Sequence, residues 1–527
     1  MDWINNHIIT ISITIALITS LLCIAAPSSF IALRISLVGS AACFFSALHI
    51  WYHYQASLGS IQFNESYEWI GLFGISYQVG VDGLNLLFIV LSTFLTPIVI
   101  LSLWDKQIKN KKILLSLVMF LEASILGALA ALDLFFFYFC WEVMIIPVYL
   151  IIGFWGGKKR FQTSKKLILC NACGSIFMFV GIIALYIKHT GEFGFYSASL
   201  IDLLKINSLD LSTQKWLFAA FTFAFAVRIP VWPLHTWLVS AYSQAPFFGS
   251  IILSGVVLKI ACYGFLRFVI PLFPEAFTFF APSTLILAII GFIFVALAAW
   301  KQEDIKKLVA YASISHLSLA FVGCVLINGC DMSPEALMGA VYRIISHGIS
   351  FSALFIILSN LYGKKLSSKT NSCEKSQRLN RYLKVAVMLI TLDCMGIPGT
   401  GGFISQFLIL KEIYTSSGVT GTFISLGVLA SAAHMFKIYK KLLNSKNQAH
   451  TNLVELSIRE KLLSMSLICI ALAMGIYPEL IFSKVRPTIE HFANNYQTYL
   501  LRTENELTRV PKHIKMDIYT SLIKGEK

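Results

Sequence analysis

The side chains with the clearest chemistry lie within two long apolar runs, between residues 216 and 270. Arg228 ends a nearly pure apolar run and is followed by Pro230 and His235, while Lys259 lies in the middle of the next run. A proline within a helix removes a backbone hydrogen bond and clashes with the preceding turn. In a bilayer such a break persists only where the freed backbone is buried in protein or lines a wet cavity. A broken helix beside buried cations therefore predicts an ion-handling site within a membrane.

Ionisable side chains also occupy other apolar runs. Glu142 lies in the middle of LFFFYFCWEVMIIPVYL, and the further members are Glu122, Arg267, His316, Arg343, His347, Asp393, His434 and Lys437. A charge at mid-membrane costs roughly 2.5–3.5 kcal/mol, so a row with both signs predicts ion pairs or a hydrated polar axis. Each member alone has a plainer explanation. Glu142 and a cation would serve as a static pair, a histidine can satisfy a backbone carbonyl, and Arg267 and Lys437 are typical of snorkelling side chains.

The composition identifies the setting of these side chains. The chain has 527 residues, of which 57% are hydrophobic and 13% are charged, and its mean hydropathy is +0.74. Soluble domains carry about 25% charged residues, so the sequence predicts a polytopic membrane protein and excludes a soluble enzyme. The net charge of +15 comes from Lys and Arg in short loops, which favours a lipid bilayer and not nucleic acid as the partner.

Apolar runs of about 20 residues predict transmembrane helices, and the chain has about fourteen of them. The expected spans are 8–26, 30–50, 83–104, 113–132, 134–155, 167–187, 216–238, 247–270, 276–300, 305–327, 336–361, 383–410, 421–439 and 461–482. The loops after spans 3, 5, 9, 11 and 13 are rich in Lys and Arg, which places them in the cytoplasm and both termini on the outer side. The tail 484–527 is polar and charged and suits a helix on the membrane surface.

An internal repeat divides this all-α chain. Pro398 lies 168 residues after Pro230, and similar offsets separate the starts of spans 4 and 9 and of spans 6 and 11. Two units of five helices, each with one broken helix, would have opposite orientations because five is odd, so an inverted repeat is expected. The predicted parts are 1–112 with spans 1–3, 113–270 and 276–440 as the two repeats, and 441–527 with span 14 and the surface tail.

Several long segments resemble the antiporter-like membrane subunits of respiratory complex I, and most of all their subunit M branch, the mitochondrial subunit-4 type. These segments are LFFFYFCWEVMIIPVYLIIGFWGGKKR, FAVRIPVWPLHTWL, YSQAPFFGSIILSGVVLKIACYGFLRF, LVAYASISHLS and RIISHGISFSALF, and the likeness extends over about residues 80–440. It implies a proton-translocating subunit of NADH:quinone oxidoreductase, associated with other membrane-arm subunits, including homologous antiporter-like ones. Subunits of multisubunit sodium/proton antiporters share many of these motifs.

The chain itself is expected to hold no redox cofactor or metal. Its eleven cysteines are scattered, and it has no cysteine cluster and no G-x-G-x-x-G after a strand. The resemblance implies that NADH, FMN, iron–sulfur clusters and quinone bind to partner subunits. The distribution of positive charge suits a bacterial plasma (inner) membrane.

The resemblance also implies roles for single residues. In this family a span-5 glutamate pairs with a lysine at the span-7 break, and a span-8 lysine continues the path through histidines to an acid or lysine in span 12. Glu142 matches the glutamate and Lys259 the span-8 lysine. His235, His316 and His347 match the histidines.

Three positions differ from that pattern. Arg228 replaces the span-7 lysine, and because a guanidinium stays protonated it suits a fixed counter-charge to Glu142. Gln406 replaces the span-12 glutamate and cannot titrate. Asp393 is an additional acid, but thirteen residues of unbroken helix would place it about 20 Å from Gln406, so it substitutes only if the break folds it back. Three hypotheses follow: a proton pump with a rewired path, a sodium/proton antiporter subunit, or a structural subunit that has lost pumping.

Overall fold

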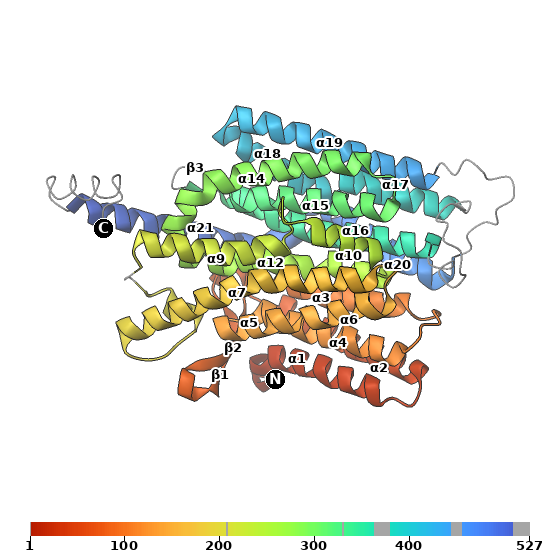
Figure 1. The fold of residues 1–527 in the computed structure, drawn as a ribbon, viewed down its shortest axis with the longest axis horizontal. Coiled ribbons are helices and arrows are strands. Elements are labelled where there is room, and N and C mark those ends of the chain that lie inside the picture. The colour runs from red at the N-terminus through yellow and green to blue at the C-terminus, as the bar shows by residue number, and fades with distance from the viewer. Residues whose placement is uncertain (1, 207–208, 329–330, 363–379, 444–455, 510–527) are drawn as a thin grey trace.

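The fold is a bundle of long helices in a computed structural model that describes residues 2–206, 209–328, 331–362, 380–443 and 456–509 (Figure 1). Most helices run in roughly the same direction and pack side by side, as expected of a chain that crosses a bilayer repeatedly. The first part comprises α1 (Asp2–Ala25), α2 (Ser29–His53), the 3₁₀ helix η1 (Ala56–Leu58), β1 (Gln62–Ile70), the 3₁₀ helix η2 (Gly71–Phe73), β2 (Ile75–Val81) and α3 (Gly83–Ser102).

The next part holds the first broken helix. It comprises α4 (Lys111–Ala130), α5 (Leu134–Val143), α6 (Ile145–Trp155), α7 (Arg160–Phe193), α8 (Leu200–Leu203), α9 (Leu211–Arg228) and α10 (Thr236–Gln244). A single helix-like span then follows as α11 (Phe247–Ile252), the π-helical η3 (Leu253–Val257), α12 (Leu258–Gly264), the π-helical η4 (Phe265–Val269) and α13 (Ile270–Leu272).

The remaining elements include the second broken helix. They are α14 (Pro274–Lys301), α15 (Ile305–Cys324), β3 (Ile327–Asn328), β4 (Asp331–Met332), α16 (Pro334–Tyr362), α17 (Arg381–Met395), α18 (Gly401–Ser416), α19 (Gly418–Leu443), α20 (Ile458–Ile476) and α21 (Glu479–Arg509). The breaks between α9 and α10 and between α17 and α18 fall at the expected prolines, Pro230 and Pro398.

Eleven helices of the described chain are long and apolar enough to cross a membrane, or twelve if the bent pair α20–α21 is one span. The fourteen expected runs include 216–238 and 383–410, which the structure divides into α9 with α10 and α17 with α18. The halves of these two broken helices are not among the eleven. The chain is therefore a predominantly helical, multi-pass membrane protein.

Two short antiparallel hairpins add to the expected all-α fold. Strands β1 and β2 pair with Tyr67 opposite Tyr77, and β3 pairs with β4. The first part of the expected tail 484–527 lies in the helix α21, which buries Val485 and Ile489 and packs against α3 and α16. Residues 510–527 of that tail lie outside the described residues.

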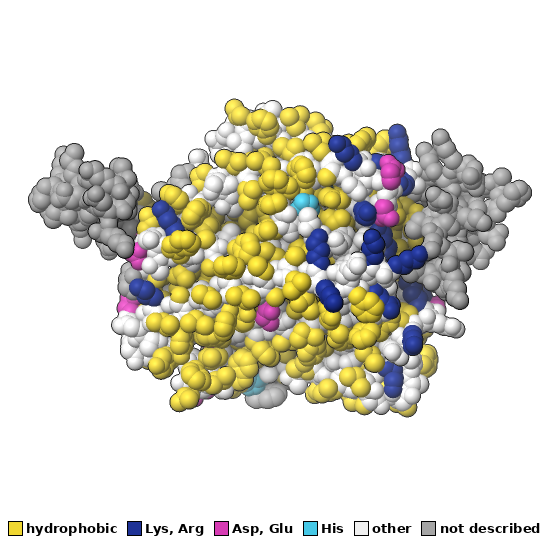
Figure 2. Space-filling model, viewed as in Figure 1, with side chains coloured by type: hydrophobic (Ala, Val, Ile, Leu, Met, Phe, Trp, Pro, Cys, Tyr) yellow, Lys and Arg dark blue, Asp and Glu magenta, His cyan; other side chains and the backbone are white. Residues whose placement is uncertain are grey.

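The surface is divided by residue type. Figure 2 shows hydrophobic side chains across the middle of one face and Lys and Arg gathered mainly toward one end. Within the bundle, α16 and the span 247–272 are buried along their whole transmembrane windows. These two central helices carry Lys259, Arg343 and His347.

Candidate functional site

A lysine and a histidine meet at the centre of the bundle. Lys259 lies on α12, and its Nζ is 2.6 Å from Nδ1 of His347 on α16. The same ammonium donates to the carbonyl of Ser254 in the π-helical η3. Both side chains are nearly fully buried. This pair can share one proton, because a charged Lys259 donates to a neutral imidazole and a neutral Lys259 accepts from Nδ1–H.

The close approach of η3 and α16 depends on glycine. A Cβ on Gly348 would lie 3.0 Å from the carbonyl oxygen of Gly255 and 3.4 Å from Cε of Lys259. Gly255 lies in η3, whose π-helical turn inserts an extra residue before Lys259. Such turns are rare and occur frequently at functional sites.

Histidines continue the row away from Lys259. Nε2 of His347 is 3.0 Å from the Ser313 hydroxyl, and the ring centroids of His347 and His316 are 6.2 Å apart. Nε2 of His316 is 3.0 Å from the Ser431 hydroxyl. The ring of His434 lies 6.0 Å from that of His316. The structure thus brings Lys259, His347 and His316 together.

Arg343 occupies the far side of His316. One of its terminal nitrogens lies 3.0 Å from Nδ1 of His316, and another lies 3.5 Å from the carbonyl of Gly402. With its amide oxygen turned toward the guanidinium, Gln406 accepts from Arg343 at 3.0 and 3.3 Å. Because a guanidinium only donates, Nδ1 of His316 must act as the acceptor. His316 is therefore neutral at Nδ1 in this arrangement.

The second broken helix folds Asp393 back to the start of α18. Oδ1 of Asp393 accepts the backbone N–H of Gly402 at 3.0 Å, and Oδ2 accepts the hydroxyl of Ser350 on α16. Gly396 ends α17 with a φ of 77°, and a Cβ at Gly402 would meet the backbone oxygen of Asp393 at 2.0 Å. The break thus folds Asp393 back toward α18, which is the condition under which it could substitute for an acid at position 406.

Arg228 ends α9 and is held by a neighbouring tryptophan. Its guanidinium carbon lies 3.5 Å from the ring centroid of Trp141, and it donates to the Trp141 carbonyl and to Oδ1 of Asn171, both at 3.1 Å. Trp141 precedes Glu142 on α5. No ion pair between Arg228 and Glu142 occurs among the described residues, where the guanidinium is stacked on the tryptophan, and its role as a counter-charge to Glu142 stays a prediction. One terminal nitrogen of Arg228 and Oε1 of Glu142 are buried without a hydrogen-bond partner.

His235 stands apart from the Lys259 row. It precedes α10 at the first break and lies 5.9 Å, ring to ring, from Tyr311 of α15. Its Nδ1 is buried and has no hydrogen-bond partner among the described residues. His235 therefore marks the polar end of the break but makes no hydrogen bond to another predicted site residue.

Arg267 and Lys437, the two side chains expected to snorkel, have different partners. Arg267 instead forms a buried ion pair, with 2.5 Å between its terminal nitrogen and Oδ2 of Asp82, so that expectation is wrong. Asp82 is fixed there because its other oxygen caps α3. Lys437 does extend to a helix end, donating to the Trp300 carbonyl at 2.5 Å. Together with Lys441 it holds the pKa of the exposed Glu303 below its ordinary value.

Polar partners of the row were not evident from the sequence. The hydroxyls of Ser313, Ser350 and Ser431 and the amide of Asn171 contact the predicted charges. Serines are common in transmembrane helices, so no sequence signal separates these from the rest. Asn171 lay within an apolar run and could have been singled out on that ground.

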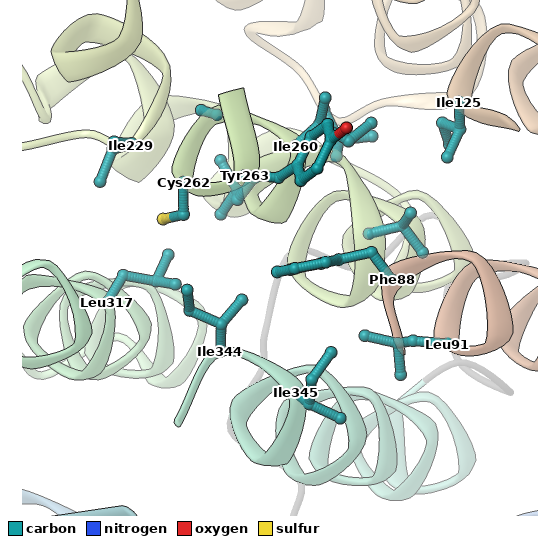
Figure 3. Packing of buried hydrophobic residues seen from close by; sticks show 14 of the residues in the cluster. Phe88, Leu91, Ile125, Ile229, Ile260, Cys262, Tyr263, Leu317, Ile344 and Ile345 are labelled. Carbon is teal, nitrogen blue, oxygen red and sulfur yellow. The ribbon is translucent and has the colours of Figure 1, made fainter. Parts of the chain in front are cut away.

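Apolar side chains enclose the row. Figure 3 shows Leu317 beside Ile344, and Phe88 beneath Tyr263. Leu317 follows His316 directly, and Ile344 follows Arg343. The side chains of the row itself are at most 2% exposed, which strengthens the interactions between them; they are Lys259, His316, Arg343 and His347. No group of three or more metal-ligating side chains occurs within the described part of the chain.

Comparisons with known proteins identify the family. A family model described as "NADH:quinone oxidoreductase/Mrp antiporter, TM" matches residues 130–432. The chain belongs to this family. A protein of Rhodobacter capsulatus named NADH-quinone oxidoreductase subunit M is 33% identical over 459 residues, covering 84% of this chain and 86% of that protein. NADH-ubiquinone oxidoreductase chain 4 of Marchantia polymorpha is 30% identical, covering 92% of this chain and 96% of that protein.

Solved structures of this family share the fold. A chain in respiratory complex I from Thermus thermophilus matches with a TM-score of 0.80 at 24% identity, covering 93% of this chain and 99% of that one. A chain of the Mrp complex from Dietzia sp. DQ12-45-1b matches with a TM-score of 0.77 at 17% identity, covering 94% and 99%. The family model and the named relatives confirm the resemblance to the antiporter-like membrane subunits.

Proposed function

We propose that this chain is a proton-translocating membrane subunit of a complex-I-type NADH:quinone oxidoreductase. The observation that carries the proposal is the buried Lys259–His347 contact of 2.6 Å, continued through His316 to Arg343. A lysine that shares a proton with a neutral imidazole at the centre of a bilayer-spanning bundle can take up and release that proton. The curated relatives, named as subunits of NADH-quinone oxidoreductase, support the same assignment.

The path we propose uses the predicted residues in order. Glu142 and Arg228 form the electrostatic start at the first break, with His235 at its polar end. Lys259, His347 and His316 carry the proton, and Asp393 and Gln406 lie at the second break. NADH, FMN, iron–sulfur clusters and quinone bind to partner subunits, and this chain contributes no redox centre.

We further propose fourteen spans arranged as two inverted repeats, 113–270 and 276–440. Counting each broken pair, α9 with α10 and α17 with α18, as one span adds two to the twelve obtained with α20–α21. The remaining parts are 1–112 and 441–527. The Lys- and Arg-rich end faces the cytoplasm of a bacterium, and both termini lie on the outer side of its inner membrane.

A structural subunit without pumping is the second candidate. Arg228 and Gln406 favour it, because neither side chain can carry a proton along the family path. In that case Lys259 and the histidines would stabilise the bundle only. Loss of pumping would leave the complex assembled and able to reduce quinone without this subunit's share of proton transport.

Purification in mild detergent followed by transport assays tests the proposal. We expect co-purification with a flavin-bearing peripheral arm and NADH-driven proton uptake into liposomes, which falls when Lys259 is changed to Gln. Co-purification with antiporter subunits alone would identify a sodium/proton antiporter. An unchanged proton-per-electron ratio in Lys259→Gln would establish the structural role.

A further inference from the structure

The second break holds an acid, Asp393, and a cation, Arg343, beside Gln406, which cannot titrate. We propose that Asp393 is the proton acceptor at this break. Arg343 is the positioning residue, and its fixed positive charge balances the ionised Asp393 carboxylate. This inference rests on the proposed proton-translocating function. Gln406 then serves as a neutral ligand of Arg343 and does not exchange a proton.

The folded-back end of α17 places the Asp393 carboxylate where an acid on α18 would project. Its Oδ1 accepts the N–H of Gly402, in the first turn of α18, four residues before Gln406. A Cβ at Gly396 would lie 2.6 Å from the amide carbon of the Gln406 side chain. The end of α17 therefore packs directly on the Gln406 side chain, and Asp393 and Gln406 share one polar site.

Arg343 needs a counter-charge that its direct contacts do not supply. His316, the Gly402 carbonyl and Gln406 are all neutral acceptors. Arg343 is buried, with 1% of its surface exposed. Both side chains contact Gly402, because Arg343 donates to its carbonyl at 3.5 Å and Asp393 accepts its N–H at 3.0 Å. A buried cation without an anion is costly, so the pair keeps this part of the bundle neutral while Asp393 is ionised.

The contact between Arg343 and His316 makes the arrangement sensitive to a proton. Nδ1 of His316 accepts from Arg343, so a proton arriving at Nδ1 places two donors and two positive charges face to face at 3.0 Å. Transfer of that proton to the Asp393 carboxylate restores a neutral imidazole and forms a neutral carboxyl. No other reactant takes part, and the carboxyl then releases the proton toward the aqueous side.

A glutamate introduced in place of Gln406 would behave differently in this site. Its carboxylate would meet the Arg343 nitrogens that Gln406 now contacts at 3.0 and 3.3 Å. A bidentate ion pair of this kind is strong and geometrically specific. The introduced carboxylate would therefore be held ionised by Arg343 and would carry a proton poorly unless that arginine were removed.

The test moves the acid between the two positions in the purified, reconstituted complex. We expect Asp393→Asn to lower coupled proton uptake at least tenfold and Asp393→Glu to retain most of it. Adding Gln406→Glu to Asp393→Asn should restore little, whereas adding Arg343→Gln as well should restore uptake several-fold. Glu65→Gln is the matched control, because Glu65 is a buried carboxyl on β1 that is bonded to Thr10 of α1 and does not belong to the row.

Two results would overturn the inference. One is proton uptake at the wild-type level in Asp393→Asn, and the other is an equal loss in Asp393→Asn and Glu65→Gln. A second readout is independent of pumping. The infrared carbonyl band of the Asp393 carboxyl, assigned by its loss in Asp393→Asn, should titrate at a higher pH in Arg343→Gln, because the stabilising cation is gone. If the wild-type complex pumps no protons through this chain but this shift is present, the proposed function fails and the Asp393–Arg343 coupling stands. If the shift is absent, the coupling is overturned.

Discussion

At the scale of single residues, the two arginines at the breaks are fixed charges with different surroundings. Arg228 is stacked on Trp141 and bonded to Asn171, whereas Arg343 contacts His316 and Gln406. Neither guanidinium can release a proton in a protein. The protonatable groups of the row are therefore Lys259, the histidines and Asp393, and the arginines set the potential in which they act.

We expect Arg228→Lys to destabilise the protein by about 2 kcal/mol, because an ammonium cannot reproduce a desolvated planar stack on Trp141. Thermal unfolding in detergent measures this loss. The matched control is Arg34→Lys, since Arg34 is exposed and lies 4.2 Å from the Phe30 ring centroid. Equal melting temperatures for both variants would show that the buried stack contributes nothing special.

A second substitution separates charge from proton exchange at the centre of the row. Lys259→Arg keeps a positive charge beside His347 but not a group that releases its proton. We expect NADH-driven proton uptake to fall at least tenfold, as in the neutral Lys259→Gln. Lys437→Arg, at a helix end, should change uptake less than twofold. Wild-type uptake in Lys259→Arg would mean that Lys259 acts only as a charge.

Much of this site could be predicted because buried charges in apolar runs are rare and each one carries information. Lys259, His316 and His347 were singled out on that ground and lie together. The sequence could not show that Arg228 stacks on Trp141, because that depends on side-chain rotamers within a packed interface. Nor could it show the pairing of Arg267 with Asp82, which are distant in the chain and meet only in the fold.

At the scale of elements, irregular helix geometry positions the chemistry. The π-helical η3 places Lys259 against α16, and the break after α17 returns Asp393 to α18. Prolines at 230 and 398 allowed the breaks to be predicted. The π turns and the hairpin of β1 with β2 have no comparable signal, because the former arise from helix packing and the latter from a short stretch without an apolar run.

Gly348 provides a test of the contact between η3 and α16. In Gly348→Ala the new methyl group would lie 2.8 Å from Leu91 Cδ2 and 3.0 Å from the Gly255 carbonyl, so α16 must shift away from Lys259. We expect a loss of about 1–3 kcal/mol in stability and a several-fold fall in coupled proton uptake. Gly191→Ala on α7 is the control, because nothing lies within 4 Å of its Cβ. Matching behaviour of the two variants would contradict the role of this close approach.

At the scale of the whole molecule, positive charge distinguishes the two ends of the bundle. Lys109 lies between α3 and α4, where its carbonyl accepts from Trp155 at the end of α6. Lys205 lies between α8 and α9, beyond the opposite ends of α4 and α7. Lys and Arg gather mainly at one end of the face in Figure 2. Because cytoplasmic loops carry the excess of Lys and Arg, the charge asymmetry predicts how the whole chain is inserted.

Cysteine labelling tests that orientation and, through it, the inverted repeat. Lys109 and Lys205 are both exposed lysines, so Lys109→Cys and Lys205→Cys are matched substitutions at opposite ends. In intact spheroplasts, a membrane-impermeant maleimide should label Lys205→Cys above the background of the natural cysteines, and Lys109→Cys only after permeabilisation. Five spans lie between the start of the first proposed repeat and that of the second, so a cysteine in place of Glu303, after α14, should behave like Lys109→Cys. Labelling of that cysteine from outside would require an even number of spans in the first unit, and the two breaks would then not be related by inversion.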